Sequence, residues 1–298
     1  MKHLIRSTAP AILAMAFAFA APGSRAQQQT TPQPGQQQQQ QQQNPPAQGN
    51  KPSLQGQTPT PGNGQAQAPA QAPKVDPAEE SAYKEFADLK IDDYDQQIKL
   101  GEDFVKKYPE SRYREIVYNR LTTAYYSKQQ VDKMYDTSNK ALALNPNDVQ
   151  VLVLVGWVIP HNYDPNDPEA DRRLATAEAY EKHALEILST LPKPATLTDE
   201  QFNTAKAQDA SMAHSGLGLI YFRQQKPQDS LNELQQSTSS GKPDPVDLFI
   251  MGIDLDSLKR YNDAAQAFDK CAQIPGVMQD RCKQQEAKSK TEATQSPK

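Results

Sequence analysis

The feature that most constrains this chain is a 34-residue repeat of large, small and aromatic residues that runs through its second half. Each window opens with large apolar residues around one small residue, at the i, i+3, i+4 and i+7 spacing of a helix. A second helical set containing alanine or serine follows, and a proline lies near the close. Gly218 and Gly252, two of the small residues, are 34 positions apart. Such a period indicates stacked helical units that share a core with their neighbours.

Four windows share this frame, at 115–148, 149–192, 211–244 and 245–278, and a looser unit precedes them. The first-helix core positions are Tyr118, Leu121, Thr122 and Tyr125, then Leu152, Val155, Gly156 and Ile159, then His214, Leu217, Gly218 and Tyr221, then Leu248, Met251, Gly252 and Leu255. The second-helix positions are Met134, Ser138 and Ala141, then Ser230, Leu234 and Ser237, then Ala264, Phe268 and Cys271. The small residue allows two helices to approach closely, and the aromatics fill the space toward the next unit.

Two short segments carry a resemblance to a known family. Residues 140–147, Lys-Ala-Leu-Ala-Leu-Asn-Pro-Asn, closely resemble the end of a tetratricopeptide repeat. Residues 106–111, Lys-Lys-Tyr-Pro-Glu-Ser, resemble units of bacterial envelope proteins of the same family. The resemblance covers about residues 78–278, although no unit has the tryptophan of the family's first helix. It implies an all-α, right-handed superhelical solenoid of about five antiparallel helix pairs with a C-terminal capping helix.

The units expected within a helical domain at 77–290 are 78–111, 115–148, 149–192, 199–244 and 245–278, with a capping helix at 278–289 and a disordered tail at 291–298. The third unit carries an insertion, 160–173, between its helices, and 191–198 delays the fourth. Thr198 followed by Gln201 has the pattern of a capping box. It predicts the start of a long helix that continues to Phe222.

The N-terminus has the pattern of a secretory signal peptide at 1–26. A basic start with Lys2 and Arg6 precedes an apolar run at 9–21, and the small residues Ser24 and Ala26 favour cleavage after Ala26. The run covers only about 20 Å at 1.5 Å per residue, against a hydrocarbon core of about 30 Å, which argues against an uncleaved anchor. No later stretch is apolar enough to span a membrane. The pattern predicts a protein exported to the periplasm or secreted.

Residues 27–76 are rich in glutamine, proline, alanine, glycine and threonine and contain an unbroken glutamine run at 36–43. Charges are limited to Lys51, Lys74 and the terminal Asp76, and large apolar residues are almost absent. Such a composition cannot bury enough surface to offset the entropy of ordering. We expect a disordered leader that acts as a spacer. A proline-rich recognition segment, or one that threads through cell-wall polymer, is the alternative.

Charge and motifs exclude several function classes. The formal net charge is −4 and no basic stripe is present, which argues against nucleic acid as the partner. Nucleophile elbows, phosphate loops and dinucleotide fingerprints are absent, so no enzyme activity and no cofactor are expected. The loop around His161 contains several acids, but it lacks the glycine of an EF-hand and has Ala175 where the bidentate glutamate belongs. No metal site is expected either.

The two cysteines, Cys271 and Cys282, form an even pair, which favours a disulfide in an exported chain. Cys271 lies on the inner face of the last second helix, and Cys282 on the helix that follows. Positions of this kind pack together wherever such units stack. The bond would attach the capping helix to the end of the solenoid. The alternative is two small buried thiols.

The family resemblance also implies a concave groove lined by the first helices. Transferred position by position, its partner-binding residues include Asn119, Tyr126, Trp157, Met212, Leu219, Phe222, Phe249 and Ile253. Apolar and aromatic side chains of this kind mark interaction sites. The lysine and asparagine set that clamps an acidic C-terminus in some members is absent, since only Asn119 matches. The alternative is that the helix at 199–223, or the leader, covers this face.

These features predict a non-enzymatic scaffold that binds a protein or peptide segment in the groove. The rival is a structural or assembly accessory of the cell envelope, in which the solenoid is a spacer or an oligomerisation unit. A peptide- or carbohydrate-processing enzyme finds no residues to support it. The identity of the partner, the pathway and the oligomeric state stay open.

Overall fold

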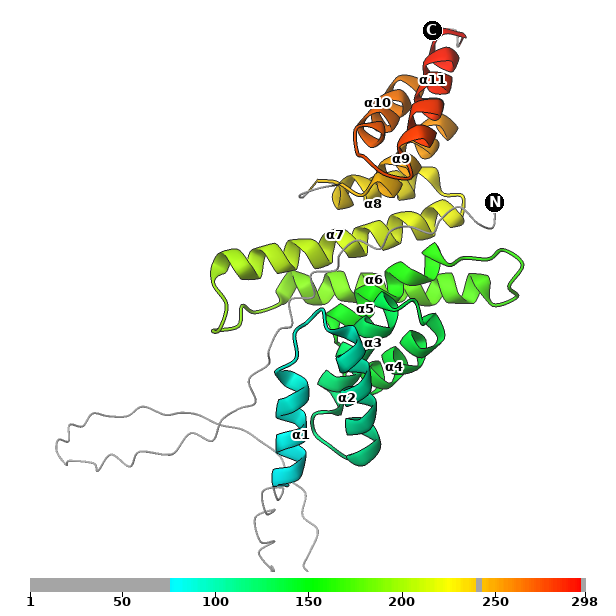
Figure 1. Cartoon of the computed structure of the whole chain (residues 1–298). Helices are drawn as coiled ribbons and strands as arrows, with labels where there is room; N and C mark the ends of the chain where they lie inside the picture. Colours follow the sequence, from blue (N-terminus) through cyan, green and yellow to red (C-terminus); the bar gives the residue numbers. More distant parts are fainter. Residues whose placement is uncertain (1–75, 240–242, 296–298) are drawn as a thin grey trace, which may run out of the picture. The chain divides into compact units, whose positions relative to one another are not determined.

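The computed structural model describes residues 76–239 and 243–295, and these fold into eleven helices without a strand (Figure 1). The expected signal peptide at 1–26 and the leader up to residue 75 lie outside the described residues. The same is true of 240–242 and of 296–298. Within the described part, no helix has both the length and the apolar character needed to cross a membrane.

Helices follow one another along the chain in pairs, and α11 follows the last pair. Their bounds are α1 Pro77–Ala87, α2 Tyr94–Lys107, α3 Arg114–Ser127, α4 Val131–Leu144, α5 Val149–His161, α6 Ala170–Thr190, α7 Asp199–Arg223, α8 Pro227–Ser237, α9 Pro245–Ser257, α10 Tyr261–Ala272 and α11 Gln279–Gln295. Sequential helices pack against each other, and α5 and α9 also contact α7. The buried side chains form several small clusters, each shared by neighbouring helices, as expected for stacked repeats. The expectation of an all-α helical-repeat solenoid is confirmed.

Three of the helix pairs turn in the same way. Gln129, Gln225 and Lys259 each follow the first helix of a pair with φ of 58°, 58° and 60°. The next amide donates back to a carbonyl five residues earlier, for example Lys226 to Tyr221 at 2.9 Å. This left-handed termination satisfies carbonyls at the end of the first helix and reverses the chain. The repeat is therefore built into the backbone as well as into the side-chain pattern.

Close approach between paired helices depends on the small residues that the repeat predicts. A Cβ atom on Gly252 would lie 2.5 Å from the ring of Phe268, and one on Gly218 would lie 2.5 Å from the side chain of Leu234. Both partners are fully buried. The large residue of each second helix therefore fills the space that the glycine of the first helix leaves open.

The third unit differs in detail from the sequence expectation. The sequence predicts the insertion at 160–173, but α5 continues through Pro160 to His161 and α6 already begins at Ala170. Pro160 lies in the last turn of α5, is buried, and leaves only His161 after it in the helix. Aspartate side chains shape the shorter loop, since Asp164 accepts from the amide of Asn166 at 3.0 Å and Asp167 from that of Glu169 at 2.9 Å.

Helix α7 begins with the capping box that the sequence predicts. Thr198 Oγ1 accepts from the amide of Gln201 at 3.2 Å, and Gln201 Oε1 accepts from the amide of Thr198 at 3.0 Å. The resulting helix of 25 residues is the longest one described. Its length lets it contact α5, α6, α8 and α9.

The C-terminal helix is longer than the expected cap at 278–289. It runs to Gln295, so 291–295 belong to a helix rather than to the expected disordered tail. Ser289 is buried and donates to Asp256 Oδ2 at 2.9 Å, which attaches this half of α11 to α9. Lys290 pairs with Glu286 at 2.6 Å. The next proline after the start of α11 is at position 297, so the sequence offers nothing that stops the helix earlier.

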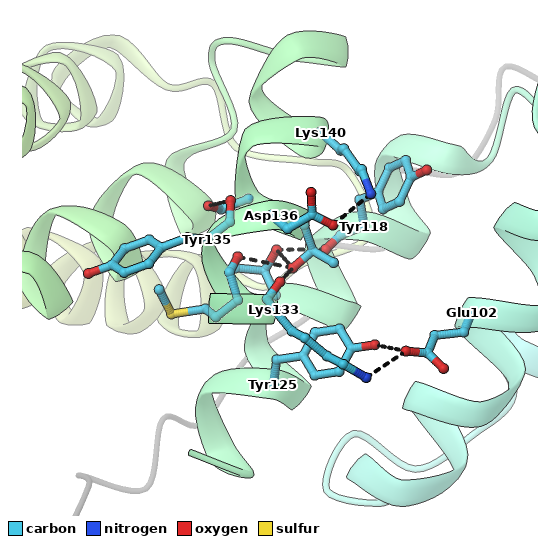
Figure 2. A network of polar contacts seen from close by, with 11 residues as sticks. Glu102, Tyr118, Tyr125, Lys133, Tyr135, Asp136 and Lys140 are labelled. Atoms are coloured by element: carbon cyan, nitrogen blue, oxygen red, sulfur yellow. Dashed lines mark hydrogen bonds and ion pairs between the residues drawn. The ribbon is translucent and has the colours of Figure 1, made fainter. Parts of the chain in front are cut away.

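Polar contacts join the first unit to the second (Figure 2). The hydroxyl of Tyr125 on α3 donates to Glu102 on α2, and Lys133 on α4 reaches the same carboxylate at 3.1 Å. Thr122 and Thr137 form a buried hydrogen bond of 3.1 Å between α3 and α4. Exposed ion pairs contribute little by themselves. The contact of one carboxylate with both helices of the next unit fixes the register of stacking.

Candidate protein-binding surface

The candidate surface lies on the first helices of the second to fifth units, α3, α5, α7 and α9. These helices hold all eight of the predicted partner-binding residues, Asn119, Tyr126, Trp157, Met212, Leu219, Phe222, Phe249 and Ile253. Six of them are partly exposed, whereas Trp157 and Leu219 are buried with 5% and 1% exposure. Two of the eight predicted residues therefore cannot serve as accessible anchors for a partner.

Trp157 is a packing residue in this structure. Its ring meets the edge of Tyr126 at a centroid distance of 6.2 Å and stacks on His161 at 3.6 Å. Its Nε1 donates to Ser215 Oγ on α7 at 3.2 Å. The expectation of an accessible tryptophan overlooked the long α7, which packs against α5 and covers the indole. That arrangement corresponds in part to the alternative in which the helix at 199–223 occupies this face.

Five partly exposed apolar side chains remain on the same helices: Tyr126, Met212, Phe222, Phe249 and Ile253. Each one rests on a buried cluster. Met212 contacts the clusters of Trp157 and of Leu152, and Phe222 contacts the cluster of Leu219 and Leu234. We call these five residues the apolar row.

Asn119, the one residue that matches the family's carboxylate clamp, has a partner within the chain. Its Nδ2 donates to Asp148 Oδ2 at 2.7 Å. Asp148 is the N-cap of α5 and also accepts from the amide of Val151 at 3.2 Å. The amide of Asn119 is therefore already directed at a carboxylate of its own chain.

Four carboxyl groups with raised pKa values lie on the first helices or directly before them, and we call them the acidic group: Asp148, Asp209, Asp244 and Asp247. Desolvation raises the pKa of each, to about 7 for Asp209 and about 7 for Asp247. The negative charge of Asp148 further raises the pKa of Asp209. Asp148, Asp209 and Asp244 are nevertheless partly accessible.

Asp247 is the most buried of the four, with 3% exposure. It accepts from Ser215 Oγ at 2.8 Å and from the hydroxyl of Ser237. Because Ser215 in turn accepts from Trp157, a chain of hydrogen bonds connects α5, α7 and α9. These hydrogen bonds fix the first helices of three successive units relative to one another.

The acidic group is not among the sites that the sequence predicts. Its members lie at helix starts and in the N-terminal extension of α7, outside the positions that the repeat assigns to the groove. For Asp148 and Asp244 the sequence did offer a signal of their position, because each directly precedes a first helix and is therefore a candidate N-cap. Nothing in the sequence indicated that Asp209 would lie near Asp148.

The histidines form no shared site. His161 donates to the carbonyl of Trp157 at 2.7 Å, and burial lowers its pKa to about 4. His214 pairs with Glu233 at 2.7 Å, and His183 contacts Asn147 at 2.8 Å. No group of three or more histidine, cysteine, aspartate or glutamate side chains in 76–239 and 243–295 has an arrangement that could hold a metal ion.

Cys271 on α10 and Cys282 on α11 are joined by a disulfide with a Cα–Cα distance of 5.8 Å. Both cysteines are fully buried, and Leu248 and Met278 pack around them. The bond connects α11 to the last helix pair.

Comparison with known proteins indicates the fold. No family model matches the chain, and no curated protein matches it in sequence. Among solved structures, PilW, a widely conserved type IV pilus biogenesis factor, is similar with a TM-score of 0.50 and 16% identity over 74% of this chain and 89% of PilW. TTC0263, a thermophilic tetratricopeptide protein of Thermus thermophilus, aligns with a TM-score of 0.43 and 15% identity over 72% and 99%. The paired helices and the likeness to PilW agree on a tetratricopeptide-like repeat fold.

Proposed function

We propose that this protein of tetratricopeptide-like fold is a non-enzymatic scaffold that binds a segment of another protein along the apolar row. The observation that carries the proposal is the row itself. Tyr126, Met212, Phe222, Phe249 and Ile253 come from the first helices of different units and keep part of their surface accessible. Apolar side chains grouped in this way mark interaction sites more often than they occur without a role.

The accessible aromatic residues are the expected anchors. Phe249 contacts the ring of Phe268 at 5.5 Å, and the guanidinium of Arg281 lies 5.4 Å from its centroid. Rings held in place by their neighbours lose little entropy when a partner packs on them. Trp157 has no such role in the proposal because it is buried.

Site-specific photocrosslinking in intact cells tests the proposal. A photoreactive phenylalanine at Met212 or Phe222 is expected to capture one defined protein. The same group at Lys99, an exposed position on α2, is the control and is expected not to capture it. Equal capture from all three positions, or none from the row, would contradict the proposal.

The second candidate is an assembly accessory of the cell envelope. The fold likeness to PilW, described as a pilus biogenesis factor, favours it together with the signal-like sequence at 1–26. In that case the crosslinks should join copies of this chain or connect it to an envelope assembly. We propose export with cleavage after Ala26. A mature chain starting at Gln27, found by mass spectrometry of the cell envelope fraction or of the medium, would support that location.

A further inference from the structure

We propose that Glu181 makes α6 a pH-responsive helix, which packs on α5 and α7 while the carboxyl holds its proton and separates from them when that proton is lost to solvent. The inference goes beyond the proposed function, because it concerns the third unit whatever segment the apolar row binds. It is argued from the place of one carboxyl group between three helices.

The carboxyl of Glu181 is enclosed by backbone on two sides. Gly156 on α5 and Gly216 on α7 face it, since a Cβ on Gly156 would lie 2.6 Å from Glu181 Oε1 and one on Gly216 would collide with the same oxygen. Glu181 is 0% exposed, and neither of its carboxyl oxygens has a hydrogen-bond partner within the described residues. Glycine lets both helices approach, but it offers no side chain that could donate to the carboxyl.

Such a site suits a protonated carboxyl far better than a carboxylate. Burying an unpaired charge costs much more free energy than burying the neutral acid. Burial accordingly raises the pKa of Glu181 well above its usual range. Once pH exceeds that raised value, the charge is stable only where water reaches it, and water enters this contact only where the helices separate.

Charges nearby do not offset this cost. Burial raises the pKa of Glu181, and no charge of the described residues acts on it. The groups that titrate near the contact have other partners, namely His161 on α5, Glu178, Lys182 and His183 on α6, and His214 and Tyr221 on α7. Asp247 on α9 is connected to this region only through Ser215, the residue before Gly216. The response of the contact to pH is therefore a property of Glu181.

The connections of α6 allow it to move by itself. Three other second helices, α4, α8 and α10, begin after short turns at 128–130, 224–226 and 258–260, whereas longer segments, 162–169 and 191–198, flank α6 on both sides. Helix α6 packs on α5 and α7, which also contact each other. The hydrogen bond of 3.2 Å from Trp157 to Ser215 joins those two helices directly. Separation of α6 therefore leaves α5 and α7 attached to each other.

Hydrogen exchange of the full chain, followed by mass spectrometry from about pH 5 to about pH 9, tests the inference. One proton is released when α6 opens. The protection of its amides, corrected for the intrinsic pH dependence of exchange, should therefore fall about tenfold for each pH unit between the ordinary pKa of glutamate, about 4.3, and the raised one. Glu181→Gln removes the proton and keeps the size of the side chain, so the ratio of wild-type to variant protection in α6 should show this slope. Helices α3 and α10 should show no such difference.

The matched control is Glu186→Gln, an exposed change on the same helix, which should behave as the wild type does. His161 and Asp247 are unchanged in all three proteins, so their own titration cancels in the ratio. Thermal unfolding of each variant checks that the fold is retained.

Trp157 provides a second readout, because it is the one tryptophan of the chain and directly follows Gly156. Acrylamide quenching of its fluorescence should increase more steeply with pH in the wild type and in Glu186→Gln than in Glu181→Gln. His161 stacks on the indole at 3.6 Å, but its pKa is about 4, so its titration lies below the range of the experiment.

Three results would overturn the assignment to Glu181 and α6. Protection of α6 that falls equally with pH in Glu181→Gln would assign the response to another group. A fall of the same size in α3 and α10 would show unfolding of the whole chain instead of movement of α6. Wild-type protection of α6 that stays constant over the whole pH range would show that the contact accommodates the carboxyl without opening.

Discussion

At the residue scale, Glu181 is the side chain least explained by the repeat. It lies on α6, is 0% exposed, and neither carboxyl oxygen has a hydrogen-bond partner. Gly156 on α5 and Gly216 on α7 form its cradle, since a Cβ on Gly156 would lie 2.6 Å from the carboxyl carbon and one on Gly216 would also collide with it. In the third unit a carboxyl occupies the space that Leu234 and Phe268 fill in later units.

Burial raises the pKa of Glu181 well above its usual range, because the ionised form cannot be solvated there. A carboxyl whose pKa is raised in the folded state costs stability as soon as pH exceeds its unfolded pKa. The cost grows until pH passes the folded pKa.

We therefore expect Glu181→Gln to raise the free energy of unfolding at neutral and basic pH by at least about 1 kcal/mol. Below the unfolded pKa of a glutamate this pH-dependent cost is absent, since Glu181 is then neutral in both the folded and the unfolded state. Urea unfolding across this pH range measures the difference. Glu186→Gln, an exposed change on the same helix, is the control. A gain that does not depend on pH would show that charge burial is not the cause.

At the element scale, the capping box gives α7 its start and thereby the N-terminal extension that carries Asp209. Thr198→Ala removes the side-chain acceptor for the amide of Gln201. Loss of an N-cap costs about 1 kcal/mol, and the effect should be local because the cap acts on the first turn only. Hydrogen exchange at 199–202 is expected to become faster, with 215–223 unchanged. Thr196→Ala, an exposed change in the preceding loop, should alter neither segment.

The last helix depends on α10 for its position. The disulfide closes a sequence separation of 11 residues, and bonds that close loops of this size contribute about 2–3 kcal/mol. We expect the mature protein to gain two hydrogen atoms in mass on reduction. Changing Cys271 and Cys282 to serine together should speed hydrogen exchange in α11 and leave α3 to α5 unchanged. Two free thiols in protein taken from an oxidising compartment would overturn this assignment.

At the scale of the whole molecule, the described carboxyl groups whose pKa is raised by burial outnumber the described groups whose pKa is lowered. Desolvation raises the pKa of Asp209, Asp247 and Asp254 to about 7 each, and that of Glu181 well above its usual value. Between about pH 4 and pH 7 the folded chain therefore binds more protons than the unfolded chain. Stability must fall as pH rises through that window. Within this window the lowered pKa of His161, about 4, acts in the opposite direction.

The midpoint of thermal unfolding is thus expected to be several degrees higher near pH 5 than near pH 8. Below about pH 4 the trend should reverse, because Glu102 and Glu178 have lowered pKa values and lose their favourable contacts on protonation. Calorimetry over this pH range measures how the midpoint changes above and below its maximum. Asp254→Asn should weaken the fall of the midpoint between about pH 5 and pH 8, because it removes one carboxyl group with a raised pKa. A midpoint that rises steadily toward pH 8 would contradict the account.

Much of the fold was accessible from the pattern of residues. The repeat predicted the helix pairs, the glycines at positions of close approach and the start of α7 at Thr198, because these depend on local spacing and local hydrogen bonds. The ends of α5 and α11 were predicted wrongly. Pro160 lies in the last turn of α5 and does not end the helix before His161. The sequence has no helix-stopping residue between the start of α11 and Gln295, and Ser289 on this helix is attached to Asp256, 33 residues earlier in the sequence.

The candidate surface divides in the same way. The sequence by itself determined that the chain repeats, which helices come first in each unit, and which apolar residues those helices carry. Only the tertiary structure decided that α7 packs over Trp157, that Glu181 fills the glycine cradle, and that Asp209 lies within reach of the charge of Asp148. The reason is physical. Helix periodicity is a property of neighbours along the chain, whereas burial and electric field depend on side chains brought together from distant units.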